Sequence, residues 1–116
     1  MNAMNRQRIV IVDDDLPGID LARSVLEADG YEVLSQAPDA GRGVAELKPH
    51  LVLVDVDAPA EVYRAGARRR HARVLLYSRA DEDLLRATAA RLHVDGYVCK
   101  DDRSALRLRV AAVLDR

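Results

Sequence analysis

The stretch LVLVDVDAP, residues 51–59, runs four consecutive apolar residues directly into Asp55, and Asp57 follows two positions later. A short, continuous apolar run is typical of a strand that is buried on both faces, as in a parallel sheet. A carboxylate, in contrast, needs water, a cation or hydrogen-bond donors around it. We therefore expect Asp55 to lie at the end of a buried strand, at a place where a polar site can form.

The rest of the chain repeats this order of a short strand followed by a helix. Strands are expected at 8–12, 31–37, 51–54, 73–77 and 96–99, and helices at 16–30, 39–48, 60–70, 81–93 and 103–115. Strict alternation predicts an α/β fold in which helices cover both faces of a parallel sheet. Right-handed crossovers favour a doubly wound five-stranded sheet of order 2-1-3-4-5, a flavodoxin-like (βα)5 arrangement. The strand at 31–37 contains Glu32 and should lie at an edge.

Size and composition indicate one globular domain. We assign residues 8–116 to this domain and residues 1–7 to a disordered tail. The formal net charge is -1, which gives no reason to expect direct binding to nucleic acid or to an anionic membrane. No apolar run approaches the roughly 20 residues that a membrane helix needs. The single cysteine, Cys99, excludes an internal disulfide and fits a cytoplasmic protein. The basic run at 68–73 is interpreted as a solvated helix end.

Polar residues follow four of the predicted strands. Asp13, Asp14 and Asp15 follow the first strand, Asp55 and Asp57 the third, Ser78 the fourth and Lys100 the fifth. In an open parallel sheet, the carboxyl ends of the strands meet at one edge, around the crevice where strand order reverses. These side chains should therefore converge, although each one alone would be an ordinary helix cap or loop residue. Asp15 in particular is interpreted as a cap.

The predicted cluster of carboxylates requires a cation. At about 4 Å and an effective dielectric constant near 20, two like charges repel by about 4 kcal/mol. Carboxylate oxygens with access to water suit Mg²⁺ (or Mn²⁺), which takes few carboxylates and keeps several waters. Beside such a cation and Lys100, the Asp55 carboxylate is a nucleophile that can attack a phosphoryl group, with Ser78 as a further donor. The predicted product is an aspartyl phosphate.

Four segments in order resemble the receiver domain of bacterial two-component response regulators, the CheY-like superfamily. Residues 9–33 (IVIVDDDLPGIDLARSVLEADGYEV) resemble its first strand, acidic pair, first helix and second strand. Residues 48–59 (KPHLVLVDVDAP) resemble the phosphoacceptor strand and loop. Residues 74–78 (VLLYS) resemble the fourth strand with its hydroxyl residue, and residues 94–102 (VDGYVCKDD) the fifth strand with its lysine. The likeness covers residues 8–115.

The resemblance implies a role for each matching residue. Asp55 would be the phosphoacceptor, and Ser78 and Lys100 would hold the phosphoryl group. Asp13 and Asp14 would be the acidic pair that binds the metal, with Asp14 the more direct ligand, and Asp57 would supply its backbone carbonyl. Tyr97 would be the aromatic switch residue. These roles are implied by the resemblance.

The resemblance also implies partners and a mechanism. A sensor histidine kinase or a phosphotransfer protein would donate the phosphoryl group to Asp55. Ser78 would move towards the phosphoryl group, and Tyr97 would move in turn. The surface formed by the fourth helix, fifth strand and fifth helix would then change and bind a downstream protein or a second copy of the chain. Such a protein catalyses only its own phosphorylation and dephosphorylation and is otherwise not an enzyme.

The sequence departs from the family's pattern at four places. Arg79 stands where a small residue is usual; it could block access, pair with Asp57, bind phosphate or point to water. Asp57 adds a charge where the family often has a neutral side chain. The loop after Asp55 keeps only Pro59 of the common pattern, and the segment up to Ser78 is short, so the third helix should be short. Asp101 replaces a frequent proline, which predicts a trans peptide bond.

Two other functions remain open at this point. The Asp-x-Asp pair of residues 55–57 also resembles haloacid-dehalogenase-like phosphatases, in which Asp57 would act as general acid and base, although that motif normally ends the first strand. Alternatively, the domain is a degenerate receiver that binds partners without being phosphorylated. The altered loop and Arg79 favour this second alternative.

Overall fold

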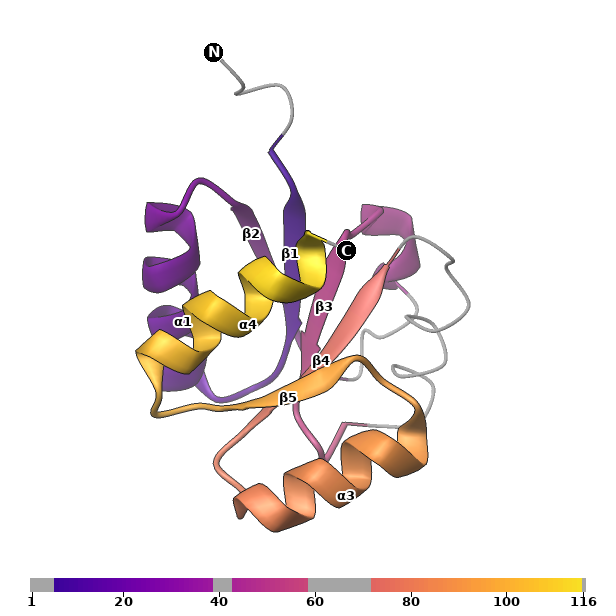
Figure 1. Ribbon diagram of the computed structural model, residues 1–116. Coiled ribbons are helices and arrows are strands. Elements are labelled where there is room, and N and C mark those ends of the chain that lie inside the picture. The colour runs from indigo at the N-terminus through magenta and orange to yellow at the C-terminus, as the bar shows by residue number, and fades with distance from the viewer. Residues whose placement is uncertain (1–5, 39–42, 59–71, 116) are drawn as a thin grey trace.

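The computed structural model describes residues 6–38, 43–58 and 72–115. The described strands and helices occur along the chain in the predicted order, and the helix predicted at 60–70 lies outside the described residues (Figure 1). The strands are β1 (Arg8–Val12), β2 (Glu32–Gln36), β3 (Leu51–Val54), β4 (Arg73–Ser78) and β5 (Gly96–Cys99), and the helices are α1 (Leu16–Ala28), the 3-10 helix η3 (Ala45–Leu47), α3 (Glu82–Leu92) and α4 (Arg103–Leu114). Within the described residues, no helix has both the length and the apolar character that a membrane crossing requires.

The five strands form one parallel sheet in the order β2-β1-β3-β4-β5. This confirms the predicted topology, including the place of β2 at an edge. Because β1 lies between β2 and β3, Ile9 of β1 is paired with Val33 on one side and with Leu51 on the other. The reversal of strand order lies between β1 and β3, which is the place where a crevice forms at the carboxyl edge of an open parallel sheet.

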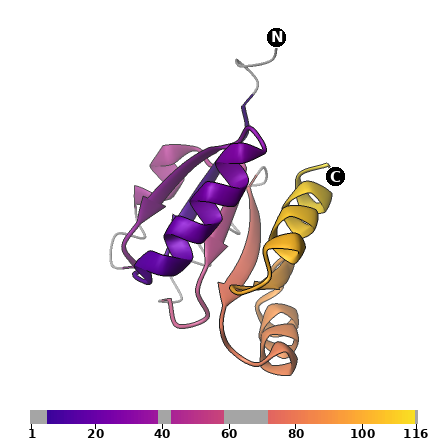
Figure 2. The same cartoon turned by 90° about the vertical axis from the view of Figure 1, so that its left-hand side faces the viewer.

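Helices cover both faces of the sheet, and each face has its own apolar core. On one face, α1 and α4 pack against alternate strand residues such as Ile11, Leu53 and Tyr77. Figures 1 and 2 show these two helices on the same side of the sheet. On the other face, α3 packs against the intervening strand residues, among them Val54 and Leu76. Burial on both faces explains why β3 is apolar at all four of its positions.

Apolar residues recur at helical spacing along α1, at Leu16, Ile19, Ala22 and Leu26, and this spacing predicts that all four are buried. Ile19, Ala22 and Leu26 are buried as expected, but the side chain of Leu16 is 69% exposed. Leu16 is the first residue of the helix, before Pro17. The helix ends at Ala28, and Gly30 adopts φ 95, a left-handed conformation that a glycine reaches without strain.

Two predicted helices cannot be compared in full with the structure. The segment at 39–48 was expected to form an α-helix, but its described part forms the short 3-10 helix η3. The predicted short third helix, at 60–70, lies outside the described residues, as do residues 1–5 of the predicted tail. Arg6, also assigned to the tail, donates hydrogen bonds to the carbonyl oxygens of Gly30 and Tyr31.

Candidate functional site

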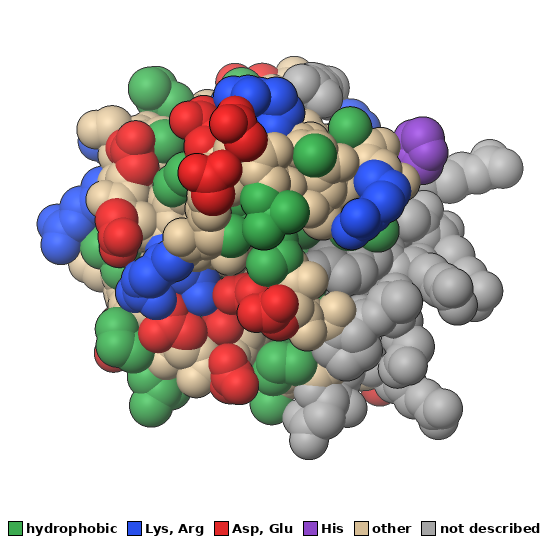
Figure 3. All heavy atoms as spheres, turned by 90° about the horizontal axis from the view of Figure 1, so that it is seen from below, with side chains coloured by type: hydrophobic (Ala, Val, Ile, Leu, Met, Phe, Trp, Pro, Cys, Tyr) green, Lys and Arg blue, Asp and Glu red, His purple; other side chains and the backbone are tan. Residues whose placement is uncertain are grey.

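The polar residues that follow the strands line one crevice of about 420 Å³ at the carboxyl edge of the sheet. Seen from this side, acidic and basic side chains lie next to each other across the face (Figure 3). The lining residues are Asp13, Asp14, Asp15, Asp55, Val56, Asp57, Ser78, Arg79, Ala80, Leu84 and Lys100. The structure therefore brings together the predicted residues that follow β1, β3, β4 and β5.

The ammonium group of Lys100 lies at the centre of the acids. Its Nζ is 2.7 Å from Oδ2 of Asp13, 3.0 Å from Oδ2 of Asp15 and 3.0 Å from Oδ2 of Asp55. The Lys100 side chain is only 3% exposed, and that of Asp13 only 2%. A buried charge of this kind is stable only when it is paired and hydrogen-bonded. Lys100 thus supplies a positive charge that the carboxylates require.

The charges of this group depend on one another. Burial disfavours the charged form of Lys100, but its interactions with the Asp13, Asp55 and Asp15 carboxylates outweigh burial and raise the pKa of the ammonium. The hydrogen bond from Lys100 lowers the pKa of Asp15, against the effect of burial, and Arg79 lowers that pKa further. The lysine and Asp15 are therefore both ionised at neutral pH.

Asp13 and Asp14 occupy different environments although they are adjacent in the sequence. Asp13 is buried, and its Oδ1 accepts the backbone N–H of Asp14 at 2.8 Å and of Asp15 at 3.1 Å. These bonds hold the Asp13 carboxylate in place below the crevice. Asp14 is exposed at the mouth of the crevice. It is therefore the member of the pair that a hydrated cation can reach most directly.

Asp55 lies immediately after β3 and is oriented by bonds to both of its carboxylate oxygens. Oδ1 accepts the backbone N–H of Asp57 at 3.0 Å, and Oδ2 accepts a hydrogen bond from Lys100. The Asp55 side chain remains 20% exposed. The buried strand thus holds the carboxylate rigidly while leaving it accessible from solvent.

Ser78 is the last residue of β4, Arg79 follows it, and both line the crevice. Ser78 is buried, and its Oγ accepts the backbone N–H of Ala80 at 3.1 Å. The Arg79 side chain is 48% exposed, and among the described contacts it does not pair with Asp57. Its guanidinium forms an ion pair with Asp15 and lies 3.5 Å from Oδ1 of Asp101. Arg79 therefore connects the loops that follow β1, β4 and β5.

Two residues have contacts in the site that their sequence context did not predict. Asp15 was interpreted as a cap, but its carboxylate contacts Lys100 and Arg79. Tyr77 was treated as part of an apolar strand, but its ring lies 5.5 Å from Nζ of Lys100, and its hydroxyl donates to the carbonyl oxygen of Gly18 at 2.9 Å. Burial raises the pKa of Tyr77 to about 12. The only available signal for Tyr77 was a polar atom in an otherwise apolar run.

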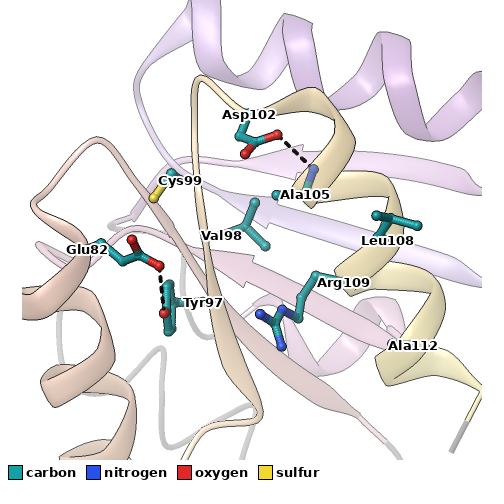
Figure 4. Close-up of a pocket in the computed structure, with 9 residues that line it drawn as sticks. All are labelled: Glu82, Tyr97, Val98, Cys99, Asp102, Ala105, Leu108, Arg109 and Ala112. Carbon is teal, nitrogen blue, oxygen red and sulfur yellow. Dashed lines mark hydrogen bonds between the residues drawn. The ribbon is translucent and has the colours of Figure 1, made fainter.

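Tyr97 lies on β5 and points away from the crevice. Its hydroxyl donates to Oε1 of Glu82 at 3.1 Å, and the guanidinium carbon of Arg109 lies 5.9 Å from its ring centre. Figure 4 shows Tyr97 between α3 and α4, in a groove of about 490 Å³. The predicted switch residue is therefore separate from the acids and lines the predicted interaction surface, which here consists of α3, β5 and α4.

The donors around the crevice fit a hydrated Mg²⁺. Among the described residues, no three His, Cys, Asp or Glu side chains are grouped as a ready metal site. Mg²⁺ nevertheless needs only one or two carboxylates because it keeps several waters. Asp14 is exposed and Asp55 partly so, and both offer the hard oxygen ligands that the ion prefers. The residues present therefore suit Mg²⁺ better than a metal that requires a complete protein cage.

The remaining predictions concern single residues. The described residues contain no cis peptide bond, so the bond between Lys100 and Asp101 is trans as predicted. Cys99 is partly buried against the apolar core on the α3 face, and burial raises the pKa of its thiol. Such packing is typical of a free cysteine that acts as a small apolar residue.

The fold and crevice can be compared with known proteins. No model of a known protein family matches the chain. A CheY-like response regulator receiver domain protein from Methanospirillum hungatei JF-1 is 26% identical, with a TM-score of 0.76 over 95% of this chain and 94% of that one. A putative response regulator from Chloroflexus aurantiacus J-10-fl is 24% identical, with a TM-score of 0.78 over 96% and 99% of the two chains. The chemotaxis response regulator CheY4 of Vibrio cholerae is 18% identical, with a TM-score of 0.74 over 93% and 98%.

Proposed function

We propose that this chain, which has the fold of response-regulator receiver domains, is a signalling domain that accepts a phosphoryl group on Asp55. One observation carries the proposal. Lys100 Nζ and Asp55 Oδ2 are 3.0 Å apart at the carboxyl edge of the sheet, inside a crevice that also holds Asp13 and Asp14. A nucleophilic carboxylate, a fixed cation and further acids are the groups that phosphoryl transfer to an aspartate requires.

The expected donor is a phosphohistidine of a sensor histidine kinase or a phosphotransfer protein. A carboxylate oxygen of Asp55 attacks phosphorus, the P–O bond forms, and the P–N bond to the donor imidazole breaks. The electron pair of that bond stays with the imidazole, which then takes a proton from water. Lys100 neutralises charge on the transferred oxygens, and the Ser78 hydroxyl donates a hydrogen bond once it turns from Ala80 towards them.

Mg²⁺ would be held by the carboxylates of Asp14 and Asp55 and by the backbone carbonyl of Asp57, with Asp13 acting through water. When bound, such an ion neutralises negative charge on the phosphoryl oxygens. Asp13 is better suited to an indirect role because it is buried and already accepts two backbone N–H groups. Mn²⁺ has similar preferences and would serve in the same place.

The signal would leave through the surface formed by α3, β5 and α4. Tyr97 lies in this groove, and Ser78 pairs with Cys99 in the register of β4 and β5, two residues beyond Tyr97. A movement of Ser78 towards a phosphoryl group would change the space beside β5 and thus the preferred orientation of Tyr97. The altered surface would then bind a downstream protein or a second copy of the chain.

Mass spectrometry of the intact protein after incubation with acetyl phosphate and Mg²⁺ tests the proposal. Wild type should gain one phosphoryl group, and Asp55→Asn should gain none because it lacks the nucleophile. Asp57→Asn is the matched control, since it removes the neighbouring exposed acid and keeps the backbone carbonyl; it should still be phosphorylated. Equal labelling of wild type and Asp55→Asn would refute the assignment of Asp55.

The second candidate is a receiver-like module that binds partners without phosphorylation. The observation in its favour is that Lys100 and Arg79 are already engaged by Asp15. It predicts that wild type acquires neither phosphoryl group nor beryllofluoride in the presence of Mg²⁺. A phosphatase of the haloacid-dehalogenase type has less support, because Asp55 and Asp57 follow the third strand of the chain and Asp57 is exposed.

A further inference from the structure

Asp15 occupies the capping position of α1 but does not act as a cap. The described part of the chain holds three α-helices, and each follows an aspartate. At α3 and α4, the side chains of Asp81 and Asp102 accept a backbone N–H of their own helix, at 3.1 and 2.9 Å. Within the described residues, the Asp15 carboxylate accepts none from α1. A capping bond typically contributes about 1 kcal/mol, so another interaction must compete with it.

The competing interaction is with the two cations of the crevice. Oδ2 of Asp15 accepts a hydrogen bond from Lys100 at 3.0 Å and also pairs with Arg79. The same oxygen thus connects the end of β1 to residues that follow β4 and β5. The Asp15 side chain is 22% exposed, so these bonds are partly shielded from water.

Gly18 makes room for this arrangement. A Cβ atom at Gly18 would lie 2.5 Å from Oδ2 of Asp15 and 3.3 Å from Cδ of Lys100. A carbon that is not bonded to an oxygen cannot lie only 2.5 Å from it. Any side chain at this position would therefore push the Asp15 carboxylate outward. The absence of a side chain at Gly18 therefore permits Asp15 to reach Lys100.

Three carboxylates surround the ammonium group of Lys100. Its Nζ donates hydrogen bonds to Asp15 and Asp55, each at 3.0 Å, and lies 2.7 Å from Oδ2 of Asp13 in an ion pair. A phosphoryl oxygen on Asp55 must therefore compete with these carboxylates for Lys100. Asp13 is anchored by two backbone N–H groups, and Asp55 is the phosphoacceptor itself. Asp15 is the remaining acid, and water can hydrate its carboxylate when it leaves Lys100.

We propose that Asp15 is a positioning residue that acts through Lys100, as an internal competitor that the phosphoryl group must displace. The proposal rests on the function proposed above for Asp55. Asp15 holds Lys100 and Arg79 in the unphosphorylated state and leaves when phosphoryl oxygens arrive. It therefore slows phosphorylation and favours return to the unphosphorylated form.

Two variants separate the effect of the contact between Asp15 and Lys100 from the effect of the charge of Asp15. Asp15→Ala removes both the contact and the charge, whereas Gly18→Ala keeps the charge and displaces the carboxylate. Asp20→Ala is the control because it removes an exposed acid elsewhere on α1. With acetyl phosphate and Mg²⁺, the initial rate of phosphorylation should rise about tenfold in both test variants, since one hydrogen bond between charged groups is no longer broken. The control should match wild type, and circular dichroism checks that all variants fold.

A direct readout follows the Lys100 ammonium itself. In ¹H–¹⁵N spectra, the hydrogen bonds to Asp15 and Asp55 should protect this group from exchange with water in wild type. The signal should broaden in Asp15→Ala and Gly18→Ala but not in Asp20→Ala, which a general loss of stability would not produce.

The outcomes distinguish the two proposals. Equal phosphorylation rates in wild type and both test variants would overturn the role of Asp15 and leave Asp55 as phosphoacceptor. Acceleration in Asp15→Ala without acceleration in Gly18→Ala would also overturn it, because net charge rather than contact would then be responsible. No labelling of any variant would overturn the phosphoacceptor function, and the role of Asp15 with it.

Discussion

The floor of the crevice (Asp13, Asp55 and Lys100) and its rim (Asp15, Arg79 and Asp101) both consist of ion pairs between aspartates and a basic side chain. The two regions differ in how far these side chains are exposed to water. On the floor, Lys100 is 3% exposed, whereas on the rim Arg79 is 48% and Asp101 80% exposed. Breaking a buried pair leaves a charge without water, but an exposed pair is replaced by hydration at little cost. The floor should therefore determine both folding and chemistry, and the rim should determine mainly access to the site.

The largest effect is expected for Lys100→Met. Removing the cation leaves Asp13, Asp15 and Asp55 to repel one another, and loss of one partner of a buried pair costs about 3–5 kcal/mol. Urea unfolding at pH 7 should show this loss, and mildly acidic buffer should reduce it because protonated carboxylates do not repel. Lys48→Met, at an exposed lysine, should leave stability unchanged. A Lys100→Met protein as stable as wild type would show that the floor is no more demanding than the rim.

Alkaline pH should reveal Tyr77, which lies beneath the floor. Its pKa rises from 10.0 to about 12 in the folded protein, so the unfolded chain releases this proton first. The contribution of Tyr77 is complete below pH 10 and decreases as the pH rises towards 12, by about 3 kcal/mol in total.

Tyr77→Phe isolates this contribution. Because it lacks the hydrogen bond to the Gly18 carbonyl, the variant should be about 1 kcal/mol less stable than wild type at neutral pH. Its free energy of unfolding should, however, fall less steeply as the pH rises. The raised pKa of Lys100 adds to the alkaline loss in both proteins above pH 10.5. Tyr97→Phe, at a partly exposed tyrosine, should follow wild type in urea titrations across this range. Identical slopes for all three proteins would contradict the burial effect.

Arg79→Ala should affect the chemistry but not the folding. Without the guanidinium, small molecules reach Asp55 more freely, so the aspartyl phosphate should form and hydrolyse several-fold faster, by less than about tenfold because exposed pairs are weak. The urea midpoint should stay within error of wild type. Arg91→Ala, at an exposed position in the last turn of α3, is the control. An unchanged phosphate lifetime would remove any role of Arg79 in access.

Salt should produce the smallest effect and should act on the rim alone. Raising ionic strength from about 0.1 M to 1 M shortens the Debye length from about 10 Å to about 3 Å, which screens exposed charges more than buried ones. The phosphate lifetime of wild type should then approach that of Arg79→Ala, whose own lifetime should change less. A strong salt dependence in Arg79→Ala would locate the screened pair elsewhere.

The sequence was sufficient for the fold because hydrophobic periodicity is a local property. The apolar runs at β1 and β3 and the stripe of Ile19, Ala22 and Leu26 each predict an element from a few neighbouring residues. Topology followed from alternation, and topology alone placed Asp55 and Lys100 at the same edge. The side chain of Leu16 shows the limit, since helical spacing did not reveal that this first position of α1 is exposed.

The partners of each charge were decided only by the tertiary structure. The contacts of Asp15 with Lys100 and Arg79 join residues 85 and 64 positions apart, and Tyr77 reaches Gly18 over 59 positions. Nothing in the neighbouring sequence distinguishes Asp15 from Asp102, which caps its helix as expected. Sequence thus determined which groups arrive at the carboxyl edge of the sheet. Ion pairs depend on separations of a few ångströms, which are set by the packing of α1 against the strands, so only the folded chain could select among them.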